Sequence, residues 1–358
     1  MTPRERFRCT MHFEPVDRIP LWEWGPWSQT VRRWRSEGMP GERGVPQFAE
    51  CDPRSDCGID FAPVPRFEKQ ILTEDDSGVT YINEIGQTIK NLHEWELSMP
   101  HFIDYPVHNR AQWEQLTERF NPDSPERYPA DWESRLTRWE QNGVTLHLMG
   151  DRNMGFFGPL RERWGPVNLM MVMMDEPGLV HEMMEFLADF FIRVMRRALA
   201  EAPIEWVIFW EDMAYTHGSL ISPEMFRQFM MPNYRKVTDF IRSHGIDIIG
   251  VDSDGNVEKL IPLWLEVGIN LVYPMEVQAG MDVVALRKKY GHDLRMTGGF
   301  DKGVLAQGKA AIDAELARVM PLIEGGGYIP TIDHSIPPDV PYENFAYYWA
   351  RKKEWIGV

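Results

Sequence analysis

Cysteine is scarce in this chain of 358 residues, which contains only Cys9, Cys51 and Cys57. Three cysteines cannot form a disulfide framework, and no two of them have the two-residue gap that is typical of zinc and redox pairs. We therefore expect reduced, structural thiols. Long hydrophobic runs are missing too, because no stretch approaches the roughly twenty apolar residues of a membrane span. These absences favour a cytoplasmic protein that does not bind a membrane.

Positive charge is also in short supply. Lysine and arginine total 38 against 54 acidic residues, which gives a formal net charge of −16. A chain this acidic is not expected to bind nucleic acid or an anionic surface. No internal repeat or low-complexity linker divides the chain, so we expect a single domain over residues 1–358. The 21 methionines and 14 tryptophans form a hydrophobic surplus that is compatible with a homodimer.

Strand-like and helix-like segments alternate along most of the chain. Candidate strands lie at residues 21–24, 58–63, 144–149, 205–210, 248–252, 269–273, 294–297 and 327–332. This alternation predicts parallel strands joined by helices, and eight strands indicate an α/β fold of the (β/α)8 TIM-barrel type. A helical extension at residues 2–11 and a β-hairpin excursion at about residues 64–92 complete the prediction. A doubly wound sheet is the alternative, but no Gly-x-Gly-x-x-Gly motif opens a helix.

Two acids, Asp252 and Asp254, follow the apolar run at residues 248–251. Their spacing places both side chains on one face of a strand, and the Asp-Gly-Asn sequence then turns the chain. Asp254 has a simpler alternative role, since an aspartate in a turn often bonds backbone amides. The pair favours function, because two acids that face one way need a cation, a shared proton or open water.

Acidic residues end the other predicted strands as well. The rim would carry Asp212, Asp252, Asp254, Glu276, Asp301, Asp333 and His334. Because ligands bind at the carboxyl ends of the strands in barrels of this kind, we expect the functional site there.

Three tryptophans, Trp22, Trp24 and Trp27, lie within six positions at the end of the first predicted strand. Each one alone is readily explained by packing. Together they could form an aromatic wall for a flat ligand.

Several motifs along the chain resemble those of one family. They are Thr-Pro-Arg-Glu-Arg at 2–6, Pro-Val-Asp-Arg-Ile-Pro at 15–20, Ile-Ser-Pro-Glu-Met-Phe at 221–226, Asp-Gly-Asn at 254–256, Gly-Gly-Phe-Asp at 298–301, Gly-Gly-Tyr-Ile at 326–329 and Pro-Tyr-Glu-Asn at 341–344. The sequence thus resembles the uroporphyrinogen decarboxylase (URO-D) superfamily, and especially its methyltransferases that act with corrinoid proteins. The resemblance implies a (β/α)8 barrel with its site at the carboxyl rim.

The chain departs from both branches of this superfamily. Porphyrinogen decarboxylases carry Arg-Gln-Ala-Gly-Arg after the first strand, where this chain reads Trp-Gly-Pro-Trp at 24–27, so porphyrinogen decarboxylation is not expected. The methyltransferases bind zinc through a His-x-Cys pair and a later cysteine, and the matching positions here are Asp252, Asp254 and His334. Two carboxylates and an imidazole carry the same formal charge as two thiolates and an imidazole. By this resemblance we predict a divalent metal at these three residues, with zinc as a candidate that oxygen ligands disfavour.

Three functions follow from these observations. The leading hypothesis is methyl transfer from an O-methylated, aromatic small molecule to a corrinoid protein, with metal assistance. The residues assigned to acid–base catalysis are Glu211, Asp212 and Asp301, and those assigned to substrate binding are Trp22, Trp24, Trp27, Arg152, Phe156 and Tyr273. The second hypothesis is a metal-independent decarboxylase or lyase of a small carboxylic acid that uses rim carboxylates. The third is a non-catalytic binding barrel.

Overall fold

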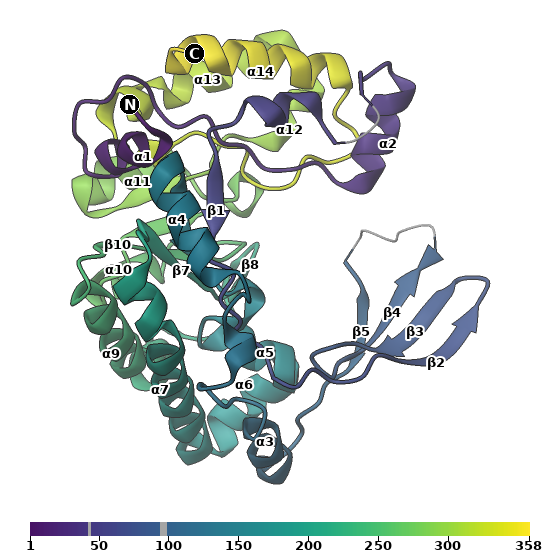
Figure 1. The fold of residues 1–358 in the computed structure, drawn as a ribbon. Helices are drawn as coiled ribbons and strands as arrows, with labels where there is room; N and C mark the ends of the chain where they lie inside the picture. The colour runs from purple at the N-terminus through teal and green to yellow at the C-terminus, as the bar shows by residue number, and fades with distance from the viewer. Residues whose placement is uncertain (42–43, 94–98) are drawn as a thin grey trace.

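A seven-stranded parallel sheet forms the centre of the protein (Figure 1). The structure is a computed structural model and describes residues 1–41, 44–93 and 99–358. In sheet order the strands are β1 (Arg54–Asp56), β6 (Thr145–Leu148), β7 (Trp206–Trp210), β10 (Ile248–Asp252), β11 (Leu271–Tyr273), β12 (Arg295–Thr297) and β13 (Tyr328–Ile329). Every neighbouring pair is parallel, so all carboxyl ends share one edge of a curled half-barrel. The predicted α/β class with a parallel sheet is confirmed.

Two of the predicted strands need correction. Residues 21–24 form no strand, although the segment is held at both ends: the Leu21 carbonyl accepts from the Asp52 amide at 2.9 Å and the Trp27 amide donates to Ile336 at 3.1 Å. Pro20 and Pro26 flank it and lack the N–H that a strand ladder requires. The strand expected at 58–63 lies instead at Arg54–Asp56. At Gly58 the chain already turns, with φ of 75°.

α-Helices connect and surround the strands of this sheet. Besides α7 (Pro177–Glu201) and α9 (Met231–Arg242) they are α1 (Pro3–Met11), α2 (Ser28–Ser36), α3 (Arg110–Thr117), α4 (Trp132–Asn142), α5 (Phe157–Trp164), α6 (Pro166–Asp175), α8 (Pro223–Met225), α10 (Ile261–Glu266), α11 (Val283–Tyr290), α12 (Lys302–Gln307), α13 (Lys309–Gly325) and α14 (Tyr342–Ile356). The longest, α7, begins with Pro177, which is favoured in a first turn, and buries apolar residues at helical spacing such as Leu179, Met183 and Leu187. No helix in the described ranges is long and apolar enough to cross a membrane.

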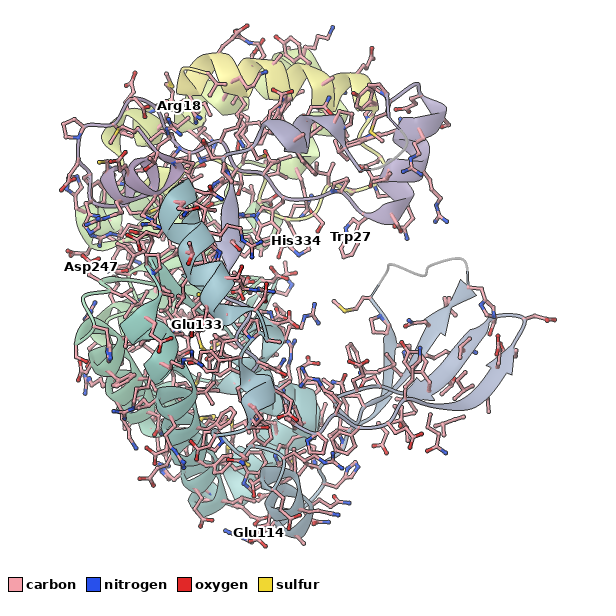
Figure 2. The ribbon with its side chains drawn as sticks, in the orientation of Figure 1. Arg18, Trp27, Glu114, Glu133, Asp247 and His334 are labelled. Atoms are coloured by element: carbon pink, nitrogen blue, oxygen red, sulfur yellow. The ribbon has the colours of Figure 1, made fainter. Side chains whose placement is uncertain are left out.

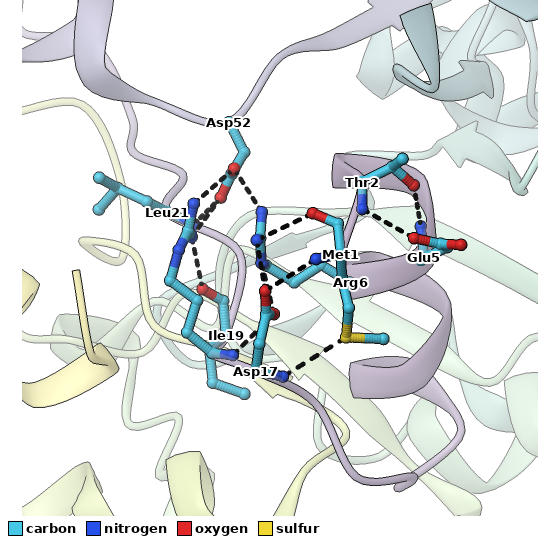
Figure 3. Close-up of polar contacts among 9 residues, drawn as sticks. Met1, Thr2, Glu5, Arg6, Asp17, Ile19, Leu21 and Asp52 are labelled. Atoms are coloured by element: carbon cyan, nitrogen blue, oxygen red, sulfur yellow. Dashed lines mark hydrogen bonds and ion pairs between the residues drawn. The ribbon is translucent and has the colours of Figure 1, made fainter.

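The predicted N-terminal helix is confirmed as α1, and a charged network ties it to the sheet (Figure 3). The Arg6 guanidinium donates to Asp52 at 2.8 Å and to Asp17 at 2.8 Å. Arg18 also donates to Asp52, at 2.6 Å, and the Leu21 amide bonds the same carboxylate at 2.8 Å. The network thus fastens α1 and the Pro-Val-Asp-Arg-Ile-Pro segment to the residues just before β1.

The hairpin excursion is a four-stranded antiparallel sheet that projects from the body (Figure 1). Its strands are β2 (Gln70–Asp75), β3 (Gly78–Ile82), β4 (Thr88–Leu92) and β5 (His101–Asp104). The first three lie within the excursion predicted at about residues 64–92, and β5 extends it beyond residue 92. Asp75 accepts the Ser77 amide at 2.8 Å in the turn between β2 and β3, as an aspartate in a tight turn does.

Candidate functional site

Aromatic rings line the inner face of the sheet. The Trp22 and Trp206 rings stack with centroids 6.0 Å apart, and Trp206 lies 6.3 Å from Tyr273. Trp24 in turn lies 6.2 Å from Tyr273 and is half-buried, whereas Trp22 is 2% exposed. Of the predicted wall, Trp24 therefore has accessible surface and Trp22 belongs to the packed floor. Phe156 is fully buried against Phe191 and Tyr234 and lies in the core.

Asp252 ends β10 and lies in register with Trp210 of β7 and Tyr273 of β11, so it shares their inward face. Burial raises the pKa of its carboxyl well above the usual value, and the charges of Asp254 and Asp212 raise it further. No hydrogen bond to this carboxyl occurs among the described residues. These surroundings thus favour the neutral, protonated form of Asp252.

Asp254 pairs with His334 from the segment that follows β13. The His334 Nε2 lies 3.3 Å from an Asp254 carboxylate oxygen, and this hydrogen bond raises the pKa of His334. The Trp27 ring lies 6.1 Å from the His334 ring, and Figure 2 shows both on the side of the molecule from which the antiparallel sheet projects. Gly255 makes the turn possible, because its φ is 81° and a Cβ there would lie 2.7 Å from the Ala214 backbone.

The three predicted metal ligands do not converge. Asp254 and His334 meet, but the described part of the chain contains no group of three or more His, Cys, Asp or Glu side chains arranged to hold a metal ion. The residues therefore do not fit a preformed metal site.

Glu211 is predicted to be catalytic, yet its carboxylate is fully occupied. It accepts the amides of Phe156 at 2.7 Å, Phe157 at 2.6 Å and Gly158 at 2.9 Å. The Tyr234 hydroxyl donates to it as well. Burial raises the pKa of Glu211 to about 7 in spite of these bonds. The amides belong to the first turn of α5, whose N–H groups have no helical partner, so Glu211 holds that helix against β7.

Asp212 and Asp301 also have partners. The Arg161 guanidinium donates to the Asp212 carboxylate at 2.7 Å, and Asp212 takes a positive φ of 40°. Arg161 and the predicted substrate ligand Arg152 lie over the Trp210 ring, each 5.1 Å from its centroid. Asp301 caps α12 by accepting the Gly303 amide at 2.8 Å. Asp212 therefore remains near the mouth of the sheet as half of an ion pair.

A buried cluster lies next to this rim. The Asp333 carboxylate is fully buried, accepts the Val277 amide at 2.8 Å and the Lys302 amide at 3.0 Å, and lies 3.8 Å from the Lys302 ammonium. Burial raises the pKa of Asp333 to about 6. Lys302 also binds Glu276 at 3.2 Å. These contacts join the loops after β11, β12 and β13, which fixes the backbone that carries His334.

Three inward residues escaped the sequence analysis as site residues: Arg54, Asp56 and His147. The His147 Nε2 lies 3.6 Å from an Asp56 oxygen, and burial followed by the Arg54 charge lowers the pKa of His147 to about 3. Burial raises the pKa of Asp56. The period-two spacing of Arg54 and Asp56 was the available signal. It was missed because the strand was predicted four residues too late.

Another cavity lies elsewhere. It has a volume of about 580 Å³ and is lined by Glu205 and Asp247, which precede β7 and β10, so it opens at the amino ends of the strands. In Figure 2 Asp247 lies on the opposite side of the molecule from Trp27 and His334. The Asp247 carboxylate is paired with His12 at 2.8 Å. Because no predicted site residue lines this cavity, we assign the site to the carboxyl ends.

Comparison with known proteins identifies the family. The uroporphyrinogen decarboxylase (URO-D) family model matches residues 161–355, more than half of the chain, so this protein belongs to that family. It is 24% identical to uroporphyrinogen decarboxylase of Trichormus variabilis (strain ATCC 29413 / PCC 7937) over 184 residues, 50% of this chain and 49% of that protein. The match to the Maricaulis maris (strain MCS10) enzyme is 25% over 131 residues, 36% of this chain and 37% of that protein. The chain thus spans about half or less of these relatives.

One solved structure shares the fold over the whole chain. A methyltransferase from Methanosarcina mazei superimposes with a TM-score of 0.60 and covers 99% of both chains at 16% sequence identity. At this identity the likeness establishes the fold.

Proposed function

We propose that this protein is a methyltransferase that removes the methyl group of an O-methylated aromatic molecule bound at the carboxyl ends of the sheet. The proposal rests on the Asp252 carboxyl, which has a raised pKa and no hydrogen-bond partner among the described residues. Cleavage of a methyl ether leaves a phenolate oxygen, and a neutral carboxyl without a hydrogen-bond partner can protonate it. The name of the Methanosarcina mazei neighbour supports the choice of methyl transfer.

The proposed acceptor of the methyl group is a reduced corrinoid carried by a separate partner protein. The electron pair for the new bond to the methyl group would come from this corrinoid. In this step the methyl–oxygen bond breaks, the oxygen keeps the bonding pair, and it receives the Asp252 proton. Trp24 and Trp27 offer accessible aromatic surface for the substrate ring. No step passes through a metal bound by this chain, because Asp252, Asp254 and His334 form no metal site among the described residues. The predicted homodimer stays a prediction.

The proposal is tested with purified protein, 4-methoxybenzoate and a reduced corrinoid protein, by measuring the phenol that forms. We expect Asp252→Asn to lower the turnover rate roughly 100-fold or more, the usual contribution of a positioned acid. Asp76→Asn is the matched control, since Asp76 lies exposed in the turn between β2 and β3. Equal turnover by wild type and Asp252→Asn would contradict the role of Asp252.

A decarboxylase or lyase is the second candidate, and Arg54 favours it. A guanidinium without an internal counter-ion can grip a substrate carboxylate, and Asp252 could then protonate the carbanion. Carbon dioxide release from 4-methoxybenzoate or related acids in the absence of any corrinoid would favour this candidate. Phenol formation that needs the corrinoid protein would favour methyl transfer.

A further inference from the structure

Arg54 places a cation on the inner face of the sheet. It opens β1 and shares its face with Asp56, two residues on, which lies in register with the inward His147. Its guanidinium lies over the Trp22 ring, 4.9 Å from the centroid. The side chain is exposed to solvent, yet protein surrounds it enough that desolvation lowers its pKa. Arg54 is thus a cation in a sheltered, aromatic setting.

The acids nearest to Arg54 are all engaged elsewhere. Glu23 is buried and binds the Lys352 ammonium at 2.8 Å and the Tyr348 hydroxyl at 2.6 Å. Asp52, two residues before Arg54, is bound by Arg6 and Arg18, each through an ion pair.

Asp56 uses its two oxygens for the Gly58 amide at 2.6 Å and the Met149 amide at 2.9 Å. Within the described ranges Arg54 itself forms no ion pair and no side-chain hydrogen bond. Its five N–H donors therefore have no protein acceptor.

The other two arginines of the site each act on an acid of the rim. Arg161 is neutralised by Asp212 at 2.7 Å. Arg152 is exposed, as Arg54 is, and forms no ion pair or side-chain hydrogen bond within the described residues, but its charge lowers the pKa of Asp252 and so acts on the acidic rim. The net charge of the chain is −16, yet no carboxylate of the described residues is bound to this sheltered arginine. Its guanidinium is therefore able to bind an anionic group of a ligand.

We infer that Arg54 binds the carboxylate of the substrate, so that the substrate class is methoxylated aromatic acids rather than neutral aryl ethers. A guanidinium matches a carboxylate through two parallel N–H···O bonds. Trp24, which is half-buried and lies 6.2 Å from the inward-facing Tyr273, supplies aromatic surface on the same face of the sheet. The methoxy half of this inference rests on the proposed function, whereas the carboxylate half does not.

The test measures, by calorimetry and without corrinoid, how tightly the protein binds 4-methoxybenzoate and its neutral analogue 4-methoxybenzamide. We expect wild type to bind the acid at least about 10-fold more tightly than the amide, and Arg54→Met to lose that preference by weakening acid binding roughly 10- to 100-fold. Arg54→Lys should keep part of it, because the charge remains without the planar fork. Arg193→Met, at an exposed ion pair with Asp123, is the matched control and should bind like wild type.

Two outcomes would overturn the inference. One is equal or absent binding of acid and amide by wild type. The other is loss of the preference in Arg152→Met but not in Arg54→Met, which would assign the carboxylate to Arg152. Thermal unfolding checks folding: Arg54→Met should melt at or above the wild-type temperature, because the substitution removes a sheltered charge that binds no protein group.

The binding result and the proposed function can fail separately. Preferential binding of the acid without methyl transfer would support the carboxylate site and contradict the proposed reaction. Methyl transfer with equal kcat/KM for the acid and the amide would support the proposed reaction and contradict the role of Arg54.

Discussion

Glu211 and Asp252 are carboxylic acids at the ends of the neighbouring strands β7 and β10, and they differ in the groups that surround them. Burial raises the pKa of both. Glu211 is met by three backbone amides and a tyrosine hydroxyl, whereas Asp252 has no hydrogen-bond partner among the described residues. An acid at a strand end can thus be a structural anchor or a reactive group, and its donors decide which.

Removal of the Glu211 charge should have the largest effect. In Glu211→Gln an amide N–H₂ group would face the amides of α5, leaving buried donors unpaired. We expect the free energy of unfolding to fall by about 3 kcal/mol or more. Urea denaturation measures the change, and Glu185→Gln on α7, which is exposed, is the control. A loss under about 0.5 kcal/mol would show that Glu211 does not hold α5.

The opposite sign is expected at Asp252. Its raised folded-state pKa gives stability that is complete below the unfolded pKa and is lost as pH rises toward the folded pKa. Asp252→Asn removes this loss. The free energy of unfolding of the variant should therefore rise relative to that of wild type by at most about 1.4 kcal/mol per pH unit above pH 4. Melting temperatures at pH 5 and pH 7.5 measure the gain. A variant less stable than wild type at pH 7.5 would mean that the Asp252 carboxylate is ionised and bound.

A smaller effect is expected at the Asp254–His334 pair. Because Asp254 raises the pKa of His334, the pair stabilises the protein below the unfolded histidine pKa and loses this contribution as pH rises through the folded value. Both side chains are partly exposed, so screening leaves about 0.5 kcal/mol. Asp254→Asn should lower the melting temperature slightly at pH 5.5 and not at pH 9. The same loss at both pH values would contradict a charge interaction.

The smallest change is expected in metal content. Because the predicted ligands do not converge, protein purified without chelators should contain well under one divalent ion per chain, and His334→Ala should not alter this. Elemental analysis of both proteins decides the question. About one ion per wild-type chain, lost in His334→Ala, would instead establish the ligand set that the family resemblance implies.

Local sequence pattern predicted much of the fold. The apolar runs that became β6, β7, β10, β11 and β12 were found because each ends in turn or acidic residues. Pattern failed at residues 21–24, where flanking prolines prevent a ladder. It also failed at β1, whose residues Arg54, Ser55 and Asp56 are all polar and have no apolar alternation to reveal them.

The candidate site was predicted in outline only. The spacing of Asp252 and Asp254 identified the rim, and the family motifs identified His334 as their neighbour, which the 3.3 Å contact with Asp254 bears out. Arg54 was not predicted, because the sequence does not show which arginines lack a counter-ion. Only the folded structure shows that.

The sequence by itself determined the order of strands and helices, the family and the acidic rim, since these follow from periodicity and motifs within short stretches. Only the tertiary structure decided what each charged group does. The donors of Glu211 lie 23 to 55 residues away in the chain, and Lys352, which occupies Glu23, lies 329 residues away. Folding assigns such partners, and a carboxyl or guanidinium takes its chemistry from them.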